Sequence, residues 1–428
     1  MSDCVAALPY FDALPVEILW LIFEEVFESP DDWRVFLGRR IRCRGVCVRW
    51  RMVITNHPSF WNAITVARPT TQEFFQVCVE RSSAVPLSLT IDASEHGSLT
   101  DDGGSVPHLV FAQPLHFYNQ MLQEVLTTCL ERVVSLRIES DGYYNLHSVA
   151  SVLADLPMPC VSTLSVRVNR VFSASPLCLF PAPSWGPVTN LSCQGILPVI
   201  GSPGSYNALD VLVVASVRGL EILAFSGFLH SLQWLTELHI TNVDCDESTR
   251  PTVVELASVK ILHLRYDDHS SARFLQGLHF PNLLTFTVVV SDAETWNDIY
   301  ASCNHFLSRP RHFGLSCVTD DLAPQPGLWD MLDKVITANV ATAGRAVTQS
   351  LWEWLREDLS RWSSLYLLEL DSGVREEEVE EYMRRCRAYR VGALSGVSCD
   401  ICSSVPSDCE DVPPGARSSA QQRLLWLA

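Results

Sequence analysis

The chain has little charge and no long apolar run. Of its 428 residues, 19% are charged, fewer than the roughly 25% of an average globular protein, which fits a large buried core. Its longest apolar candidate, residues 209–217, is interrupted by Asp210 and followed by Arg218 and Gly219. A membrane-spanning helix needs about 20 consecutive apolar residues. We therefore expect no membrane partner.

A basic excess and a secretion signal are also missing. The formal net charge is -18, which argues against general nucleic-acid binding because such binding needs a basic face. Residues 1–10 do not have the pattern of a signal peptide, so we expect an intracellular protein, cytoplasmic, nuclear or both. The 15 cysteines are scattered, and some lie in apolar runs, as Cys317 does. We predict reduced, buried cysteines rather than a disulfide scaffold.

Motifs for catalysis and metal binding are missing as well. There is no Gly-x-Ser-x-Gly nucleophile turn, and Gly201-x-x-Gly204 lacks the Lys-Ser/Thr of a phosphate loop. The Cys399-x-x-Cys402 pair has no second pair of ligands at a useful spacing. We therefore predict that the protein is not an enzyme and has no catalytic residues, no cofactor and no metal.

Apolar residues at helical spacing open the chain. Pro15 suits the first turn of a helix, and Leu19, Ile22, Phe23 and Val26 then fall on one face. This helix should end before Pro30, and further helices are predicted over residues 32–43 and 46–55. So small a helical group cannot bury all of its large apolar side chains within itself. It should dock on the following domain, on a partner, or on both.

Arginine is concentrated in the same region. Between Trp33 and Arg51 there are seven arginines and no acidic residue: Arg34, Arg39, Arg40, Arg42, Arg44, Arg49 and Arg51. A solvated basic face, a nuclear import signal and a nucleic-acid patch are all alternatives. We favour an acidic protein partner, because opposite potentials steer association.

Three strings in this region resemble an F-box. They are Leu-Pro-x-Glu-Ile-Leu-x-x-Ile-Phe at 14–23, Val-Cys-x-x-Trp-Arg at 46–51 and Pro-x-x-Trp at 58–61. The segment between them, 29–44, is longer than in compact members of the family. The resemblance implies a helical module over residues 8–62 that docks on the Skp-type adaptor of a cullin–RING ubiquitin ligase. The adaptor-facing residues implied by it are Leu14, Pro15, Ile18, Leu19, Ile22, Phe23, Val46, Cys47 and Trp50.

One apolar spacing recurs after Trp61: an apolar residue, then another three positions on, then a third two positions further. Each copy predicts a short strand whose middle and last residues point inward. The middle residues are Ile64, Leu89, Leu136, Leu164, Leu191, Leu223, Leu238, Leu262, Phe286, Leu315 and Leu368. Most steps are 24 to 32 residues, two are nearly twice that and may hide an extra unit, and the step from 223 to 238 is too short for a repeat.

The series resembles leucine-rich repeats. It implies an α/β fold class, with a small all-helical F-box-like module followed by a leucine-rich-repeat-like α/β solenoid over residues 63–393. A generic α/β domain with many strands is the alternative. Helices are predicted over 70–81, 117–132, 146–155, 209–217, 293–307, 328–362 and 375–390. Residues 394–428 are rich in Ser, Pro and Gly, so we expect a mostly disordered tail.

Side chains between the inward positions would lie on the free face of such a sheet. The candidates for substrate binding are Arg137, Glu139, Arg167, Glu237, His239, Thr241, His263 and Arg265. Their mixed charge suits a protein or peptide ligand better than a small molecule. His239 and His263 occupy equivalent positions in neighbouring repeats, where we favour a ladder of stacked rings over metal ligation.

These expectations combine into one functional hypothesis. The chain would be the substrate-recognition adaptor of an SCF-type ubiquitin ligase, with the Skp-type adaptor and a protein substrate as its partners. The alternative is a non-catalytic repeat scaffold whose N-terminal helices only cap the first hydrophobic layer.

Overall fold

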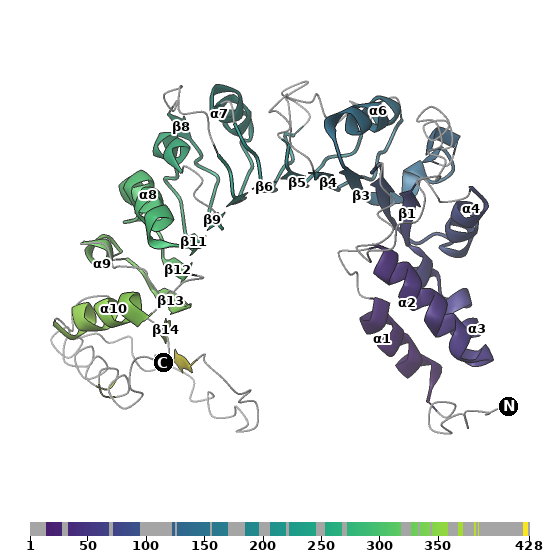
Figure 1. The fold of residues 1–428 in the computed structure, drawn as a ribbon, viewed down its shortest axis with the longest axis horizontal. Helices are drawn as coiled ribbons and strands as arrows, with labels where there is room; N and C mark the ends of the chain where they lie inside the picture. Colours follow the sequence, from purple (N-terminus) through teal and green to yellow (C-terminus); the bar gives the residue numbers. More distant parts are fainter. Residues whose placement is uncertain are drawn as a thin grey trace, which may run out of the picture. The chain divides into compact units, whose positions relative to one another are not determined.

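The computed structural model is a mixed α/β protein with N-terminal helices followed by long parallel sheets (Figure 1). It describes residues 14–27, 33–67, 72–94, 122–124, 126–154, 156–169, 185–196, 206–219, 222–244, 253–267, 272–317, 327–332, 334–342, 345–357, 367–370, 381, 384 and 423–426. The chain divides into two compact units. Unit 1 comprises residues 1–172 and 176–208, and unit 2 comprises residues 173–175 and 209–428.

The N-terminal helices of unit 1 are α1 (Val16–Phe27), α2 (Trp33–Val46), α3 (Val48–Asn56) and the short η1 (Pro58–Trp61). Leu19, Phe23 and Phe27 form the buried stripe of α1. Phe23 meets the ring of Trp50 edge-on at 5.0 Å, and Phe27 meets Phe60 edge-on at 5.4 Å. Such aromatic pairs contribute more stabilising free energy than the area they bury accounts for. These rings therefore help to hold the helices together.

The helix boundaries follow local chemistry. α1 begins directly after Pro15, as predicted. α2 continues to Val46, beyond the expected end, and α3 starts later than expected, at Val48. The thiol of Cys47 explains the second start, because its sulfur accepts a hydrogen bond from the Trp50 N–H at 3.4 Å and so caps the helix.

Five strands of unit 1 form a parallel run in chain order. They are β1 (Ala63–Ala67), β2 (Leu87–Asp92), β3 (Val133–Ser140), β4 (Thr163–Val168) and β5 (Asn190–Gln194). The connections carry α4 (Gln72–Arg81), η2 (Leu130–Arg132) and α6 (Tyr143–Ala154). α4 and α6 agree with the predicted helices. Of the helix predicted over 117–132, residues 122–124 and 126 are helical, and the part before 122 lies outside the described residues.

Unit 2 repeats the same arrangement. The parallel strands are β6 (Val211–Ala215), β7 (Glu237–Thr241), β9 (Ile261–Tyr266), β11 (Thr285–Val290), β12 (His312–Cys317), β13 (Thr337–Thr342) and β14 (Leu367–Leu370). The helices α7 (Ile222–Ser231), α8 (Ala293–Cys303), α9 (Leu328–Met331) and α10 (Arg345–Glu357) lie along one side of these strands (Figure 1). The same side holds η3 (Arg273–Gly277), η4 (Asn304–Phe306) and a two-stranded ribbon of β8 (Val254–Glu255) and β10 (Leu278–His279).

Parallel pairing aligns one apolar residue from each strand. The aligned residues are Ile64, Leu89, Leu136, Leu164 and Leu191 in unit 1, and Leu212, Leu238, Leu262, Phe286, Phe313, Ala338 and Leu368 in unit 2. Burial alternates along the strands, so that one face is buried and the other is half exposed. We call the half-exposed side the open face.

Backbone hydrogen bonds repeat where the strands of unit 2 begin. One carbonyl in each repeat accepts two successive N–H groups from the next repeat. These carbonyls belong to Asp210, Thr236, Lys260, Leu284 and Arg311. These hydrogen bonds satisfy the backbone N–H groups at the start of each strand and fix the register between repeats.

The structure exchanges two predicted elements. Residues 209–217, expected to be helical, contain β6, and the strand expected around Leu223 is α7. Leu209, Leu212 and Val214 have the repeat spacing and are all buried. In α7 the buried residues Ile222, Phe225, Ser226 and Leu229 follow helical spacing. With the strand centred at Leu212, the irregular step of 15 residues disappears.

Two further predictions change in unit 2. Phe313, not Leu315, aligns with Phe286, so the repeat there is Pro310, Phe313 and Leu315. The region 328–362, expected to be helical, contains β13 between α9 and α10, and Ala338 pairs with Leu368. That strand is the extra unit inside one of the two long steps. The other long step runs from Leu89 to Leu136. It includes residues 95–121, which lie outside the described residues.

The last part of the chain is described only in short pieces. Of the helix predicted over 375–390, Glu381 and Arg384 are described, and they are helical and form an ion pair. Residues 423–426, expected in a disordered tail, form β15 (Arg423–Trp426), which pairs antiparallel with β14. The rest of 394–428 lies outside the described residues. Within the described part of the chain, no helix is both long enough and apolar enough to cross a membrane.

Truncating the aligned residue of β6 tests the revised repeat. We expect Leu212→Ala to lower the free energy of unfolding by about 2–5 kcal/mol, because it leaves a cavity in a packed core. Leu223→Ala is the control, since Leu223 is 52% exposed, and it should change stability by less than about 0.5 kcal/mol. Urea unfolding followed by circular dichroism measures both. A larger loss for Leu223→Ala would restore the original strand assignment.

Alkylation tests the prediction of reduced, buried cysteines. Burial raises the pKa of Cys129 to about 11 and that of Cys193 to about 12, so their reactive thiolates are scarce at mildly alkaline pH. Cys160 is exposed. Iodoacetamide under native conditions, followed by peptide mass spectrometry, should label Cys160 and leave the other two unmodified until the protein is denatured. Native labelling of Cys193 would contradict the described packing.

Candidate functional site

Large apolar side chains remain exposed on all three helices of the N-terminal module. Their exposed fractions run from 36% for Val16 to 68% for Val48. We call this set the helical docking surface. It comprises Val16, Ile18 and Leu21 on α1, Ile41 and Val46 on α2, and Val48 and Met52 on α3. Exposed large apolar side chains on each of three helices that pack together make this module a candidate interaction site.

The residues that the F-box resemblance assigned to an adaptor fall into three groups. Pro15, Ile18 and Val46 are exposed. Leu14, Ile22, Cys47 and Trp50 are half buried.

Leu19 and Phe23 form the third group. Both are almost completely buried inside the module, because the stripe of α1 that they share faces α3 and η1. In this structure both side chains pack within the module. Leu21, Ile41, Val48 and Met52 were not predicted as contacts. Leu21 could have been found, since it lies one turn from Ile18 on the outer face of α1.

Several of the arginines contact other residues of the module. Arg40 is buried, its Nη1 donates to the Phe60 carbonyl at 2.7 Å, and its guanidinium lies 4.6 Å from the ring centre of Trp61. Arg44 and Arg81 lie over the same ring at 5.6 and 4.5 Å. Burial lowers the pKa of Arg40, and burial together with Arg81 lowers the pKa of Arg44.

Other arginines cap carbonyl groups at helix ends. Arg39 donates to the carbonyl of Val26 at 3.1 Å, and Arg49 donates to that of Leu14. The expected basic face for an acidic partner is therefore smaller than the sequence indicated. Arg42 is among the arginines that stay exposed.

The polar residues predicted for substrate binding lie on the open face, in two groups. In unit 1, Arg137 pairs with Glu139 at 2.7 Å, and Glu139 stands beside Arg167 on the next strand. In unit 2, His239 stands beside His263 and Thr241 beside Arg265. Arg137 and Glu139 both lie on β3, whereas the other three pairs come from adjacent strands in register, as the repeat spacing predicts.

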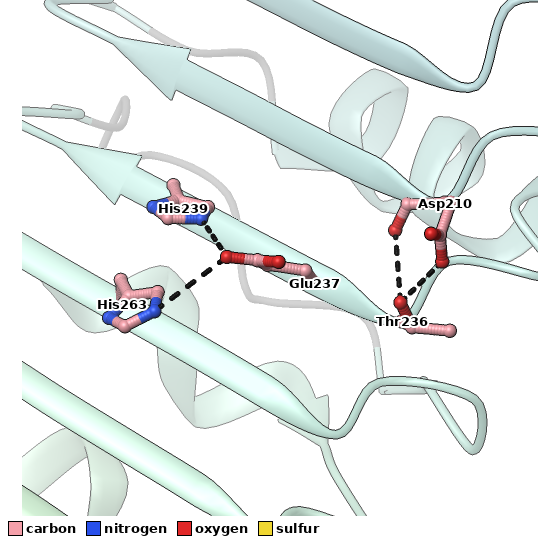
Figure 2. A network of polar contacts seen from close by, with 5 residues as sticks. All are labelled: Asp210, Thr236, Glu237, His239 and His263. Atoms are coloured by element: carbon pink, nitrogen blue, oxygen red, sulfur yellow. Dashed lines mark hydrogen bonds and ion pairs between the residues drawn. The ribbon is translucent and has the colours of Figure 1, made fainter.

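Glu237 joins the two histidines of unit 2 (Figure 2). Its Oε1 lies 2.6 Å from Nε2 of His239 and 3.8 Å from Nε2 of His263. The two imidazole rings are stacked, with centres 4.4 Å apart, which confirms the predicted ladder. Burial lowers the pKa of His263, His239 lowers it further, and Glu237 opposes both.

A hollow of about 330 Å³ lies on the open face of β11, β12 and β13. Hydroxyl and amide groups line part of it, including Thr287, Ser316 and Asn339. Gly314 opens its floor, because a Cβ there would lie 3.2 Å from Cγ2 of Thr287. Sequence reasoning did not find this hollow. Its size is at the lower end for small-molecule pockets, and a side chain of a bound peptide would also fit.

Comparison with known proteins covers the N-terminal part of the chain. The F-box-like family model matches residues 11–67, a stretch that runs from before α1 to the end of β1 and includes the whole helical docking surface. The search of curated proteins found no match. An F-box-like domain is therefore shown for residues 11–67.

Removing the buried guanidinium of Arg40 should destabilise this domain. Arg40→Ala loses a hydrogen bond from a charged group, about 1.5–3 kcal/mol, and a partly desolvated contact with Trp61. We expect a clear fall in the thermal midpoint of unit 1. Arg42→Ala, at an exposed position on the same helix, should leave the midpoint nearly unchanged. Equal midpoints for both variants would show that Arg40 is not structural.

Proposed function

We propose that this chain is a substrate-recognition adaptor of an SCF-type cullin–RING ubiquitin ligase. In this role it binds a Skp-type adaptor through its F-box-like domain and a protein substrate through the open face of its sheets. The observation that carries the proposal is the helical docking surface, which lies within the segment that matches the F-box-like family.

Energetics supports docking at these helices. Seven large apolar side chains at 36–68% exposure lose contact with water on association, at about 25 cal/mol per Å² of apolar surface buried. Contacts from Leu14, Pro15, Ile18, Ile22, Val46, Cys47 and Trp50 remain part of the proposal. Leu19 and Phe23 contribute by holding α1 against α3.

The sheets fit a leucine-rich-repeat-like solenoid. Each repeat supplies one parallel strand and one aligned apolar residue, and steps such as Leu212 to Leu238 to Leu262 are 26 and 24 residues. Leucine-rich repeats usually have periods of about 20–29 residues. Long parallel crossovers with helices on one side agree with this architecture.

The open face is the surface we assign to the substrate. Arg137, Glu139, Arg167, Glu237, His239, Thr241, His263 and Arg265 provide mixed charge. Arg265 is exposed and the other seven are partly exposed. Charges of both signs select a partner by complementarity. The covalent chemistry would belong to the associated ligase, and this chain would supply proximity.

Lysine content agrees with an adaptor role. The only lysines of the chain are Lys260 and Lys334, both exposed. A subunit held close to a ubiquitin-conjugating enzyme is itself open to modification on lysine. With only two lysine amines, this chain would offer few sites for its own ubiquitination while it presents a substrate.

The alternative role of these helices, as a cap on the first repeat, is supported by the packing of Trp61. Its indole Nε1 donates to the Ile54 carbonyl at 2.8 Å, and the ring lies between Arg40 of α2 and Arg81 of α4. These contacts fix the helices to the first repeat, as a cap of a solenoid requires. A pure cap, however, needs no exposed apolar surface on its outer side.

Charge substitutions on the docking surface separate the two roles. The full-length protein should bind a purified Skp-type adaptor, and Ile18→Asp or Leu21→Asp should weaken binding at least about tenfold, because a charge would be buried at the interface. Leu223→Asp is the control, since Leu223 is also an exposed apolar residue but lies on α7 of unit 2. Biolayer interferometry measures the affinity, and circular dichroism checks folding.

Two outcomes would count against the adaptor role. One is a wild-type chain that does not bind the adaptor. The other is equal affinity of Leu21→Asp and wild type, together with equal affinity after Leu14→Ala and Pro15→Ala. Either result would leave the cap as the function of the helices.

A further inference from the structure

Three side chains with metal-ligating atoms converge on the open face of unit 2 (Figure 2). Glu237 and His239 are two residues apart on β7, so both project from the same face, and His263 is the register partner of His239 on β9. One ligand atom from each residue lies within 4.8 Å of the others. Within the described residues, this is the one group of three or more such side chains that close together.

We propose that Glu237, His239 and His263 form a binding site for Zn²⁺. Two imidazole nitrogens and one carboxylate oxygen make up a ligand set that zinc uses in proteins with an open fourth position. Bonds of about 2.0–2.2 Å in tetrahedral geometry place ligand atoms roughly 3.3–3.5 Å apart. The separations of 2.6 and 3.8 Å from Glu237 Oε1 bracket that value.

The electrostatics of the site also favours a cation. Zinc binds the neutral form of imidazole and the ionised form of a carboxylate. The short contact between His239 and Glu237 is one that a metal can replace, because the ion attracts the carboxylate more strongly than a neutral N–H does. The chain's net charge of -18 raises the local concentration of cations.

Accessibility leaves room for a fourth ligand. The side chains of Glu237, His239 and His263 are 29%, 31% and 33% exposed, so water can complete the coordination in the free protein. The three ligands come from two strands of a packed sheet, which holds their backbone positions fixed before the ion arrives. Zinc binding at this site does not depend on the proposed ligase function.

Metal titration of the full-length protein tests the site. The chain is stripped with a chelator, its accessible thiols are alkylated under native conditions because cysteine also binds zinc, and Zn²⁺ is added in a calorimeter. We expect one tight site per chain. His239→Ala, His263→Ala and the nearly isosteric Glu237→Gln should each weaken it at least about tenfold, since each removes one of three ligands. Co²⁺ should give the visible absorption of a tetrahedral ion in the wild type and not in these three variants.

His279→Ala is the matched control. His279 also stands beside another histidine of unit 2, His305, with ring centres 5.0 Å apart, and its loss should leave the affinity unchanged. The proposal is overturned if the double variant His239→Ala/His263→Ala binds zinc as tightly as the wild type. It is also overturned if the wild type shows no site, or if Glu237→Gln retains full affinity while circular dichroism shows the native fold.

Discussion

Parallel strand pairing in register is the constraint on which the described surfaces of the sheets depend. Once Leu238 aligns with Leu262 and Phe286, the two-residue period of a strand sends the intervening side chains to the open face. A shift of one residue would bury His239 and expose the core. The shared carbonyl acceptors at the strand entrances hold that register, so the stacked histidines follow from backbone geometry as much as from their own attraction.

The F-box-like domain is governed by a different interaction. Its core closes around Phe23, Phe60 and Trp61, and the guanidinium of Arg40 is buried against the last of these. The Phe60 carbonyl accepts a hydrogen bond from Arg40, and the ring of Trp61 lies under its guanidinium; both contacts offset part of the cost of burying a cation. Using arginines in this way leaves fewer of them to attract an acidic partner, so docking at these helices would rest mainly on apolar contact.

Much of the fold could be predicted from apolar spacing, because the repeat requires the same three buried positions each time. The errors came where local composition was ambiguous. Residues 209–217 form a short and mostly apolar run, and such a run fits either a helix or a buried strand. Residues 328–362 contain helices on both sides of β13, and Ala338 gives little strand signal. Only the tertiary pairing of these segments resolves them.

Prediction of the candidate sites succeeded for residues whose position follows from the repeat and failed where packing decides. The stacking of His239 on His263 was predicted because they occupy the same position in adjacent repeats. The approach of Glu237 to both rings depends on side-chain rotation across two strands. The hollow above Gly314 depends on the absence of a side chain between two occupied strands. The burial of Leu19 and Phe23 reflects which face of α1 meets α3, and two apolar faces compete for that role in the sequence.

The two surfaces place opposite demands on the chain. Side chains on the open face contribute little to the core, so they can change to suit a ligand while the aligned apolar residues keep the fold. The docking helices have no such freedom, because exposed apolar residues such as Leu21 and Val48 favour aggregation unless a partner covers them. A domain that retains this surface beside a well-packed core gains from it only when a complementary apolar surface is present. Under the proposed function, the open face can therefore diversify in specificity, whereas the helices have to stay matched to one kind of partner.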